Sequence, residues 1–119
     1  MTFDWKEYLN LARILNGEED TEPLTREAAA RSGVSRAYYA AFCYARDKLG
    51  FVLLGEAEDH GRLRNMLQQI MRFRMTAARL DGLRKLRNQC DYNDELSVDL
   101  GDLLSFAIDA AQNVIDSLT

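Results

Sequence analysis

The feature that most constrains the fold is a helical repeat of apolar residues between positions 100 and 118. Apolar side chains recur there every three or four positions, which places them on one face of an α-helix. They are Leu100, Leu103, Leu104, Ala107, Ile108, Ala111, Val114, Ile115 and Leu118. A helix with one apolar face must bury that face against other elements. Because no segment alternates for long at the strand period, the chain is predicted to be all-α.

The first half of the chain predicts two helices. Residues 5–15 have helical apolar spacing, and Asn16-Gly17 is a stop signal after them. A second helix is expected to run to Leu49 with Gly50 as its stop, after a cap at Thr21 and with Pro23 in its first turn. Gly33 weakens this helix, so a break there is possible. The second helix carries two apolar stripes and is therefore either central in the bundle or in contact with a partner as well.

The second half predicts three more helices. The third is expected to begin near His60 after an acidic turn over residues 56–59, with a turn at 72–75 and a cap at Thr76 before the fourth. The fifth is expected to open around Ser97 with Asp99 in its first turn. The third helix should point Leu63, Leu67, Ile70 and Met71 inward, and the fourth should bury Leu80, Leu83, Leu86 or Arg87, and Cys90. Residues 1–119 are thus expected to form one domain, an antiparallel bundle of about five helices.

Composition excludes several classes of protein. No apolar run approaches the ~20 residues that span a bilayer, so no membrane partner is expected. The first residues lack a basic and then apolar export signal, which predicts a cytoplasmic location. Cys43 and Cys90 are too few for a disulfide framework and are expected to be reduced thiols in or near the core.

Charge is strongly segregated along the chain. The net charge is −4, yet residues 60–90 hold eight basic side chains and a single acid, Asp81. From Asp91 onward there are seven acids and no Lys or Arg. The basic segment predicts two adjacent helices with arginine on their outer faces, which favours an anionic ligand. The alternative is a solvated face paired with the acidic fifth helix. The binding candidates in the basic segment are Arg72, Arg74, Arg79 and Arg84.

Two motifs resemble the HEPN family, the helical "higher eukaryotes and prokaryotes nucleotide-binding" domain. One is SRAYYAAF at 35–42 followed by Ala45-Arg46, and the other is LRKLRNQCDY at 83–92. The resemblance also covers the helix order and the histidine that opens the third helix. It implies a homodimer that binds RNA or a nucleotide, related to toxin–antitoxin and defence systems, in which a neighbouring gene can encode a nucleotidyltransferase-type partner. It implies no metal and no cofactor.

Catalytic members of that family are metal-independent endoribonucleases with an arginine, four to six residues, and a histidine on one helix. Here the histidine position is occupied by Tyr92, counted from Arg87, or by Cys90, counted from Arg84. Free phenols and thiols lose their protons only near pH ~10 and ~8.5, so neither replaces an imidazole at neutral pH. The departure favours a non-catalytic or weakly active module.

His60 is the only histidine, and it has two interpretations. It can reach Arg87 across the third and fourth helices, or across a dimer, and replace the missing imidazole. It can instead open a helix beside Glu56, Glu58 and Asp59. These acids and His60 are near neighbours in sequence whose side chains point in different directions, so they are a weak candidate for a metal site. Arg87 and Asn88 are expected to point out of the bundle beside Asp91 and Tyr92, which are one helical turn away and can pair with them. This group either fixes the helix end or lines a polar cleft.

These residues and motifs are compatible with three functions. The first is a dimerising RNA- or nucleotide-binding module without strong catalysis. The second is a metal-independent endoribonuclease that uses Arg87 with Tyr92 or His60. The third is a scaffold or antitoxin-like protein whose acidic fifth helix contacts a basic partner.

Overall fold

The computed structural model describes residues 3–17, 23–50, 55, 58–96 and 99–119. Five α-helices and one short 3₁₀ turn account for nearly all of these residues, and no strand occurs among them. The elements are α1 (Lys6–Asn16), α2 (Pro23–Leu49), α3 (Asp59–Gln69), η1 (Met71–Phe73), α4 (Arg74–Tyr92) and α5 (Leu100–Ser117). The predicted all-α bundle is confirmed.

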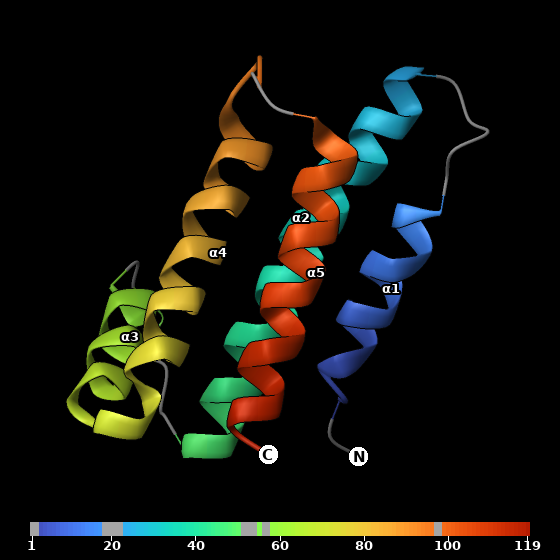
Figure 1. The fold of residues 1–119 in the computed structure, drawn as a ribbon. Helices are drawn as coiled ribbons and strands as arrows, with labels where there is room; N and C mark the ends of the chain where they lie inside the picture. Colours follow the sequence, from blue (N-terminus) through green and yellow to red (C-terminus); the bar gives the residue numbers. More distant parts are fainter. Residues whose placement is uncertain (1–2, 18–22, 51–54, 56–57, 97–98) are drawn as a thin grey trace.

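Four helices, α1, α2, α4 and α5, lie side by side and run alternately up and down the bundle (Figure 1). α1 and α2 are antiparallel neighbours, as are α4 and α5, whereas the short α3 flanks one end of α4 (Figure 1). α3, η1 and α4 together form a helical hairpin whose tip is η1. This placement brings the beginning of α3 alongside the middle of α4 and of α2.

α2 is the central helix, because α1, α4 and α5 all pack against it. Most residues of both predicted apolar stripes are therefore buried within the chain, and contact of α2 with a partner stays a prediction. It runs unbroken through Gly33. A Cβ atom at Gly33 would lie 2.7 Å from Leu104 Cδ1, so glycine serves here to let α2 and α5 approach closely.

The core is built mainly from small and aliphatic side chains of α2 and α5. Ala37, Ala40, Ala41 and Ala45 of α2 are fully buried, which lets three helices crowd around it. The largest fully buried side chain is Tyr38, which is 1% exposed. A phenol at the centre of a bundle needs a partner for its hydroxyl group, and a side chain of α3 supplies it.

Helix ends follow the predicted chemistry where they are described. Gly17 follows α1, and Gly50, with φ of 65°, ends α2 in the left-handed region that glycine tolerates. Asp99 caps α5 by accepting a hydrogen bond from the backbone N–H of Asp102 at 2.9 Å. At the end of α4, Arg31 of α2 donates to three carbonyl oxygens, those of Cys90 (2.9 Å), Asn93 (2.6 Å) and Asp94 (3.2 Å).

The α3–α4 hairpin corrects three predictions. Ile70 and Met71 were expected inside but are 38% and 79% exposed. α3 ends at Gln69, and the 3₁₀ turn that follows buries Phe73 in their place. Thr76 is not a cap, because α4 already begins at Arg74. It is buried in the first turns of α4, where its hydroxyl group hydrogen-bonds that of Ser117 at 2.7 Å.

Other sequence predictions lie outside the described residues. They are the cap at Thr21, the apolar connection at 51–54, the first half of the acidic turn at 56–57 and the opening of the last helix at Ser97. Within the described chain, none of the helices combines the length and the apolar character that crossing a bilayer requires.

Candidate functional site

Arg87 lies between α4 and α2 rather than on the outside of the bundle. Its side chain is only 14% exposed, and Nη1 is 3.5 Å from Asp91 Oδ2. The guanidinium carbon lies 5.5 Å from the ring centroid of Tyr38 and 5.4 Å from that of Tyr39. The prediction that Arg87 points outward is therefore wrong. A planar, weakly hydrated guanidinium is attracted to aromatic faces, and α2 offers two of them.

Stability alone does not account for this arginine. Its Nε atom is buried and has no hydrogen-bond acceptor in the described part of the chain. A buried donor without a partner costs about 1–3 kcal/mol. An apolar side chain of similar length would avoid that cost, so Arg87 is a candidate functional residue on physical grounds as well as by its motif.

His60 of α3 contacts the same tyrosine. The Tyr38 hydroxyl group forms a short hydrogen bond with His60 Nδ1. The imidazole is stacked on Phe42, with ring centroids 4.3 Å apart and an interplanar angle of 22°. Arg87 and His60 therefore both contact Tyr38 within one chain, whereas the interpretation that His60 replaces the missing imidazole stays a prediction.

The electrostatics of this cluster define the state of the imidazole. Burial raises the pKa of Tyr38 above its ordinary value, an effect that the nearby charge of Arg87 only partly offsets. Burial, Arg87 and Arg84 together lower the pKa of His60. At pH 7 the phenol is thus protonated and the imidazole is neutral. The direction of the hydrogen bond between Tyr38 and His60 Nδ1 depends on the imidazole tautomer. When the Tyr38 O–H donates to Nδ1, the proton of His60 resides on Nε2, which then acts as a hydrogen-bond donor.

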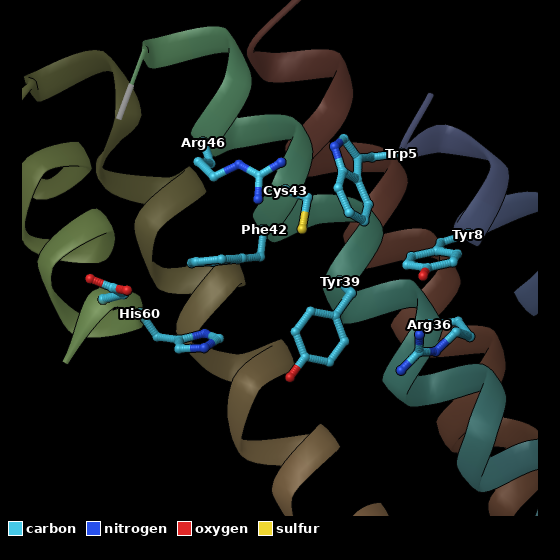
Figure 2. A pocket seen from close by; sticks show the side chains of 9 residues that line it. Trp5, Tyr8, Arg36, Tyr39, Phe42, Cys43, Arg46 and His60 are labelled. Atoms are coloured by element: carbon cyan, nitrogen blue, oxygen red, sulfur yellow. The ribbon is translucent and has the colours of Figure 1, made fainter. Parts of the chain in front are cut away.

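An open pocket of about 430 Å³ begins at His60 and extends between α1, α2 and α3 (Figure 2). Its α2 wall places side chains at helical spacing, so they share one face of the helix. Trp5 and Tyr8 close the pocket from the beginning of α1. The lining residues are Trp5, Tyr8, Arg36, Tyr39, Phe42, Cys43, Arg46, Asp59 and His60. We refer to this as the aromatic–arginine pocket.

Two guanidinium groups in this pocket are held by aromatic rings. The guanidinium carbon of Arg36 lies 4.8 Å from the centroid of the Tyr8 ring and 5.2 Å from that of Tyr39. That of Arg46 lies 5.0 Å from Trp5, and Arg46 Nε donates to Asp47 Oδ1 at 2.9 Å. Stacking fixes the plane of each group while leaving N–H donors at its edge. The pocket therefore combines aromatic rings with oriented cationic donors.

Sequence reasoning missed this pocket. The sequence predicts the aromatic residues of α2 (Tyr38, Tyr39, Phe42 and Tyr44) only as core or dimer packing. Tyr38 and Phe42 are buried, and Tyr39 is packed against the core, but Tyr39 and Phe42 also line the pocket. The available signal was the recurrence of Arg36, Tyr39 and Arg46 on one helical face. Cys43 also lines the pocket, and burial raises the pKa of its thiol, so it behaves as an apolar side chain there.

Tyr92 does not join the cluster. It is 73% exposed and lies at the end of α4, beside a different shallow pocket that Arg31 and Asp94 also line. Asp91 remains near the cluster, accepting a hydrogen bond from Ser35 Oγ at 3.4 Å in addition to its contact with Arg87. Asn88 is half-buried on the same turn.

Arg72, Arg74 and Arg79 are exposed at the other end of the α3–α4 hairpin. Arg74 is about 20 Å from Arg87 along the helix, given a rise of about 1.5 Å per residue. The predicted binding residues therefore separate into two groups rather than one continuous site.

Arg84 belongs to a network centred on Asp81. Asp81 Oδ1 lies 2.7 Å from Arg64 and 3.1 Å from Arg84, and Oδ2 lies 3.4 Å from Lys85. Burial favours a higher pKa for Asp81, but the hydrogen bonds from Arg64 and Arg84 outweigh it and lower the pKa. Among the described residues, the acidic partners of the basic segment are on α3 and α4, not on α5 as one interpretation proposed.

A second open pocket adjoins this network on the other side of His60, with Arg62, Arg64 and Arg84 in its wall. In the part of the chain that the structure describes, no three His, Cys, Asp or Glu side chains gather closely enough to hold a metal ion.

Comparison of the chain with protein-family models, curated proteins and solved structures gives no significant match. The resemblance to HEPN domains therefore stays a prediction from the two sequence motifs.

Proposed function

We propose that this chain is a HEPN-like RNA- or nucleotide-binding module and that its ligand occupies the aromatic–arginine pocket. The observation that carries the proposal is the convergence of partly exposed aromatic rings and two stacked guanidinium groups on one cavity of about 430 Å³. Cavities that hold small ligands have volumes of roughly 300–1,000 Å³.

The chemistry of the pocket matches the two halves of a nucleotide. A base stacked on an aromatic side chain gains about 1–3 kcal/mol, whichever base it is. The edges of Arg36 and Arg46 offer paired N–H donors, the geometry that phosphate oxygens accept. In the tautomer that accepts from Tyr38 at Nδ1, His60 Nε2 adds a neutral donor for a sugar hydroxyl group, a base edge or a phosphate.

Trp5 provides a direct assay. It is the only tryptophan of the chain and it lines the pocket, so its fluorescence reports occupancy. Titration with nucleotides and short single-stranded RNA at low salt should change that fluorescence. Replacing Arg36 and Arg46 by Gln removes charge-assisted hydrogen bonds of about 1.5–3 kcal/mol each, so each substitution should weaken binding by roughly 10- to 100-fold. The affinity should also fall with salt, because phosphate contacts release counterions.

Arg26→Gln is the matched control, since Arg26 is exposed on the same helix and does not line the pocket. It should leave the affinity unchanged. A Trp5 signal that no nucleotide or RNA alters at low salt, from protein with an intact helical circular dichroism spectrum, would refute the proposal.

Metal-independent RNA cleavage is a second candidate, favoured by the meeting of Arg87 and His60 at Tyr38. Protonation of a leaving oxygen needs the imidazolium form of His60, and because burial, Arg87 and Arg84 lower the pKa of His60, cleavage by this group should be fastest below neutral pH. His60→Gln should abolish cleavage measured in the presence of a chelator. Tyr92→Phe should not, because Tyr92 lies outside the cluster. Loss of cleavage in the Tyr92 variant alone would instead favour Tyr92 as the residue that occupies the motif's histidine position, counted from Arg87.

The scaffold, antitoxin and nucleotidyltransferase-partner hypotheses stay predictions that co-purification from the host would test.

A further inference from the structure

The pocket between α3 and α4 is separate from the aromatic–arginine pocket and has a different lining. Its volume is about 430 Å³, and three guanidinium groups line it, those of Arg62, Arg64 and Arg84. Among the described residues, His60 is the only one that lines both pockets. We refer to the pocket between α3 and α4 as the guanidinium pocket.

Asp81 of α4 holds two of these guanidinium groups in position. Its Oδ1 atom accepts hydrogen bonds from Arg64 Nη1 at 2.7 Å and from Arg84 Nε and Nη2 at 3.2 Å and 3.1 Å. A guanidinium group has more N–H donors than these bonds use. In the described part of the chain, Arg84 Nη1 and Arg64 Nε and Nη2 thus remain for a ligand. The two groups are therefore oriented in advance, with donors to spare.

The charges around Asp81 do not cancel. Arg64, Arg84 and Lys85 share this one carboxylate, so the three cations keep an excess of two positive charges over it. Arg64 and Arg84 are half-buried, and charges near a protein surface act more strongly than they would in bulk water. An anion with two negative charges would balance this excess.

The remaining charges of the wall do not remove the excess. Arg62 Nη1 lies 2.8 Å from Asp59 Oδ1, so these two side chains compensate each other. Glu58 also lines the pocket, but it is exposed, and water and salt weaken its repulsion of an anion. The guanidinium pocket is therefore attractive to anions.

We propose that the guanidinium pocket binds a phosphate group between Arg64 and Arg84. A phosphate group carries about −1.5 to −2 charges at pH 7, and its oxygen atoms accept paired N–H bonds from guanidinium groups. Two sources can supply it, either free inorganic phosphate or a ligand that lies across His60 from the aromatic–arginine pocket. The site itself needs only its own residues, so it stands or fails separately from the proposed function.

His60 reports the occupancy of this pocket, because it is the only histidine of the chain and stands in the wall. An anion bound there favours the imidazolium form and raises the pKa of His60. NMR titration of the histidine resonance with and without roughly 10 mM inorganic phosphate measures the shift, and chloride at equal ionic strength is the reference for screening. Phosphate should raise this pKa more than chloride does.

Arg64→Gln should weaken phosphate binding roughly 10- to 100-fold, because it removes a charge-assisted hydrogen bond. It is a cleaner change than one at Arg84, whose own charge lowers the pKa of His60. Arg26→Gln, at an exposed position of α2 outside both pockets, is the matched control and should respond as the wild type does. If Arg64→Gln fails to fold, Asn65→Glu at an exposed position of the same wall adds a negative charge and should abolish the response.

Two nucleotides distinguish the sources of the phosphate group. Uridine 5′-monophosphate carries a single phosphate group, whereas uridine 3′,5′-bisphosphate carries one at each end of the sugar. If the group belongs to a ligand that lies across His60, the bisphosphate should bind more tightly than the monophosphate, and Arg64→Gln should remove the difference. If free phosphate is the ligand, inorganic phosphate should shift the pKa of His60 while the two nucleotides bind equally.

The proposal is overturned if inorganic phosphate leaves the pKa of His60 unchanged and the bisphosphate gains nothing over the monophosphate. It is also overturned if Arg64→Gln responds as the wild type does. Loss of the response in Arg46→Gln but not in Arg64→Gln would likewise overturn it, because the phosphate then lies in the aromatic–arginine pocket. Trp5 lines that pocket and not the guanidinium pocket, so its fluorescence tests the proposed function separately.

Discussion

Replacing Gly33 by alanine should destabilise the fold even though alanine is the better helix former. An added Cβ atom would lie 2.7 Å from Cδ1 of Leu104, 3.0 Å from Cδ2 and 3.5 Å from Cγ. These atoms are the end of a flexible side chain, but Leu104 is 1% exposed, so any shift of it displaces other atoms of the core. α2 and α5 must therefore separate at this crossing, or the leucine must leave its rotamer.

The magnitude follows from two opposing effects. Alanine gains about 1 kcal/mol over glycine inside a helix. Overpacking a closed core costs about 1–3 kcal/mol. Gly33→Ala should therefore lower the free energy of unfolding by up to about 2 kcal/mol. Gly82 is the matched control, a glycine inside α4 whose added Cβ would meet nothing within 4 Å, and Gly82→Ala should raise stability by up to about 1 kcal/mol.

Thermal and urea unfolding monitored by circular dichroism measure both variants. For a chain of this size, 1 kcal/mol corresponds to about 4 °C in Tm, so the two variants should differ by roughly 4–12 °C. Combining Gly33→Ala with Leu104→Ala should cost less than the sum of the single changes, because the new methyl group enters the space that leucine leaves. Equal stability of the two glycine variants would contradict the close approach of α2 to α5.

Three further predictions concern charge. The pKa of His60 is lowered in the folded chain, so the unfolded chain binds more protons below about pH 6.5, and stability should fall as the pH drops through that value. The single histidine resonance in an NMR titration should report that low pKa, and Arg87→Met should raise it. Asp99→Ala removes the cap of α5 and should cost about 1 kcal/mol in urea unfolding. Asp81→Asn removes the carboxylate that pairs with Arg64, Arg84 and Lys85, so the protein should be retained more strongly on a heparin column. Unchanged elution would show that these three cations do not contribute to binding of a polyanion at the surface.

Most of the fold could be predicted because local rules determine it. Apolar spacing identified all five helices, and the glycines at 17 and 50 marked the ends of α1 and α2. The errors lie at the hairpin tip. Ile70 and Met71 continue the apolar period of α3, but periodicity does not reveal that a 3₁₀ turn there buries Phe73 instead. Thr76 has the chemistry of a cap, and the burial that α4 gives it depends on α5, which is distant in sequence.

The site was only partly predictable because its residues come from three helices. The motif identified Arg87, and the position of His60 at the start of α3 made a meeting across helices one of two interpretations. The inward turn of Arg87 depends on the faces of Tyr38 and Tyr39, and the pocket needs Trp5 and Tyr8 from α1. Neither the inward orientation of Arg87 nor the pocket can be predicted from the sequence of α4 alone.

The contact of Arg31 with the end of α4 bears on how the bundle opens. Its guanidinium group donates to the Cys90 carbonyl in the last turn of α4, which a helix ordinarily leaves to water, and to the carbonyls of Asn93 and Asp94 just after that turn. The last turn of α4 therefore cannot fray unless Arg31 also leaves its place on α2. Amide protons in that turn should exchange with solvent as slowly as those of the bundle core, so that the segment carrying Arg87 and Asp91 opens only when the whole domain does.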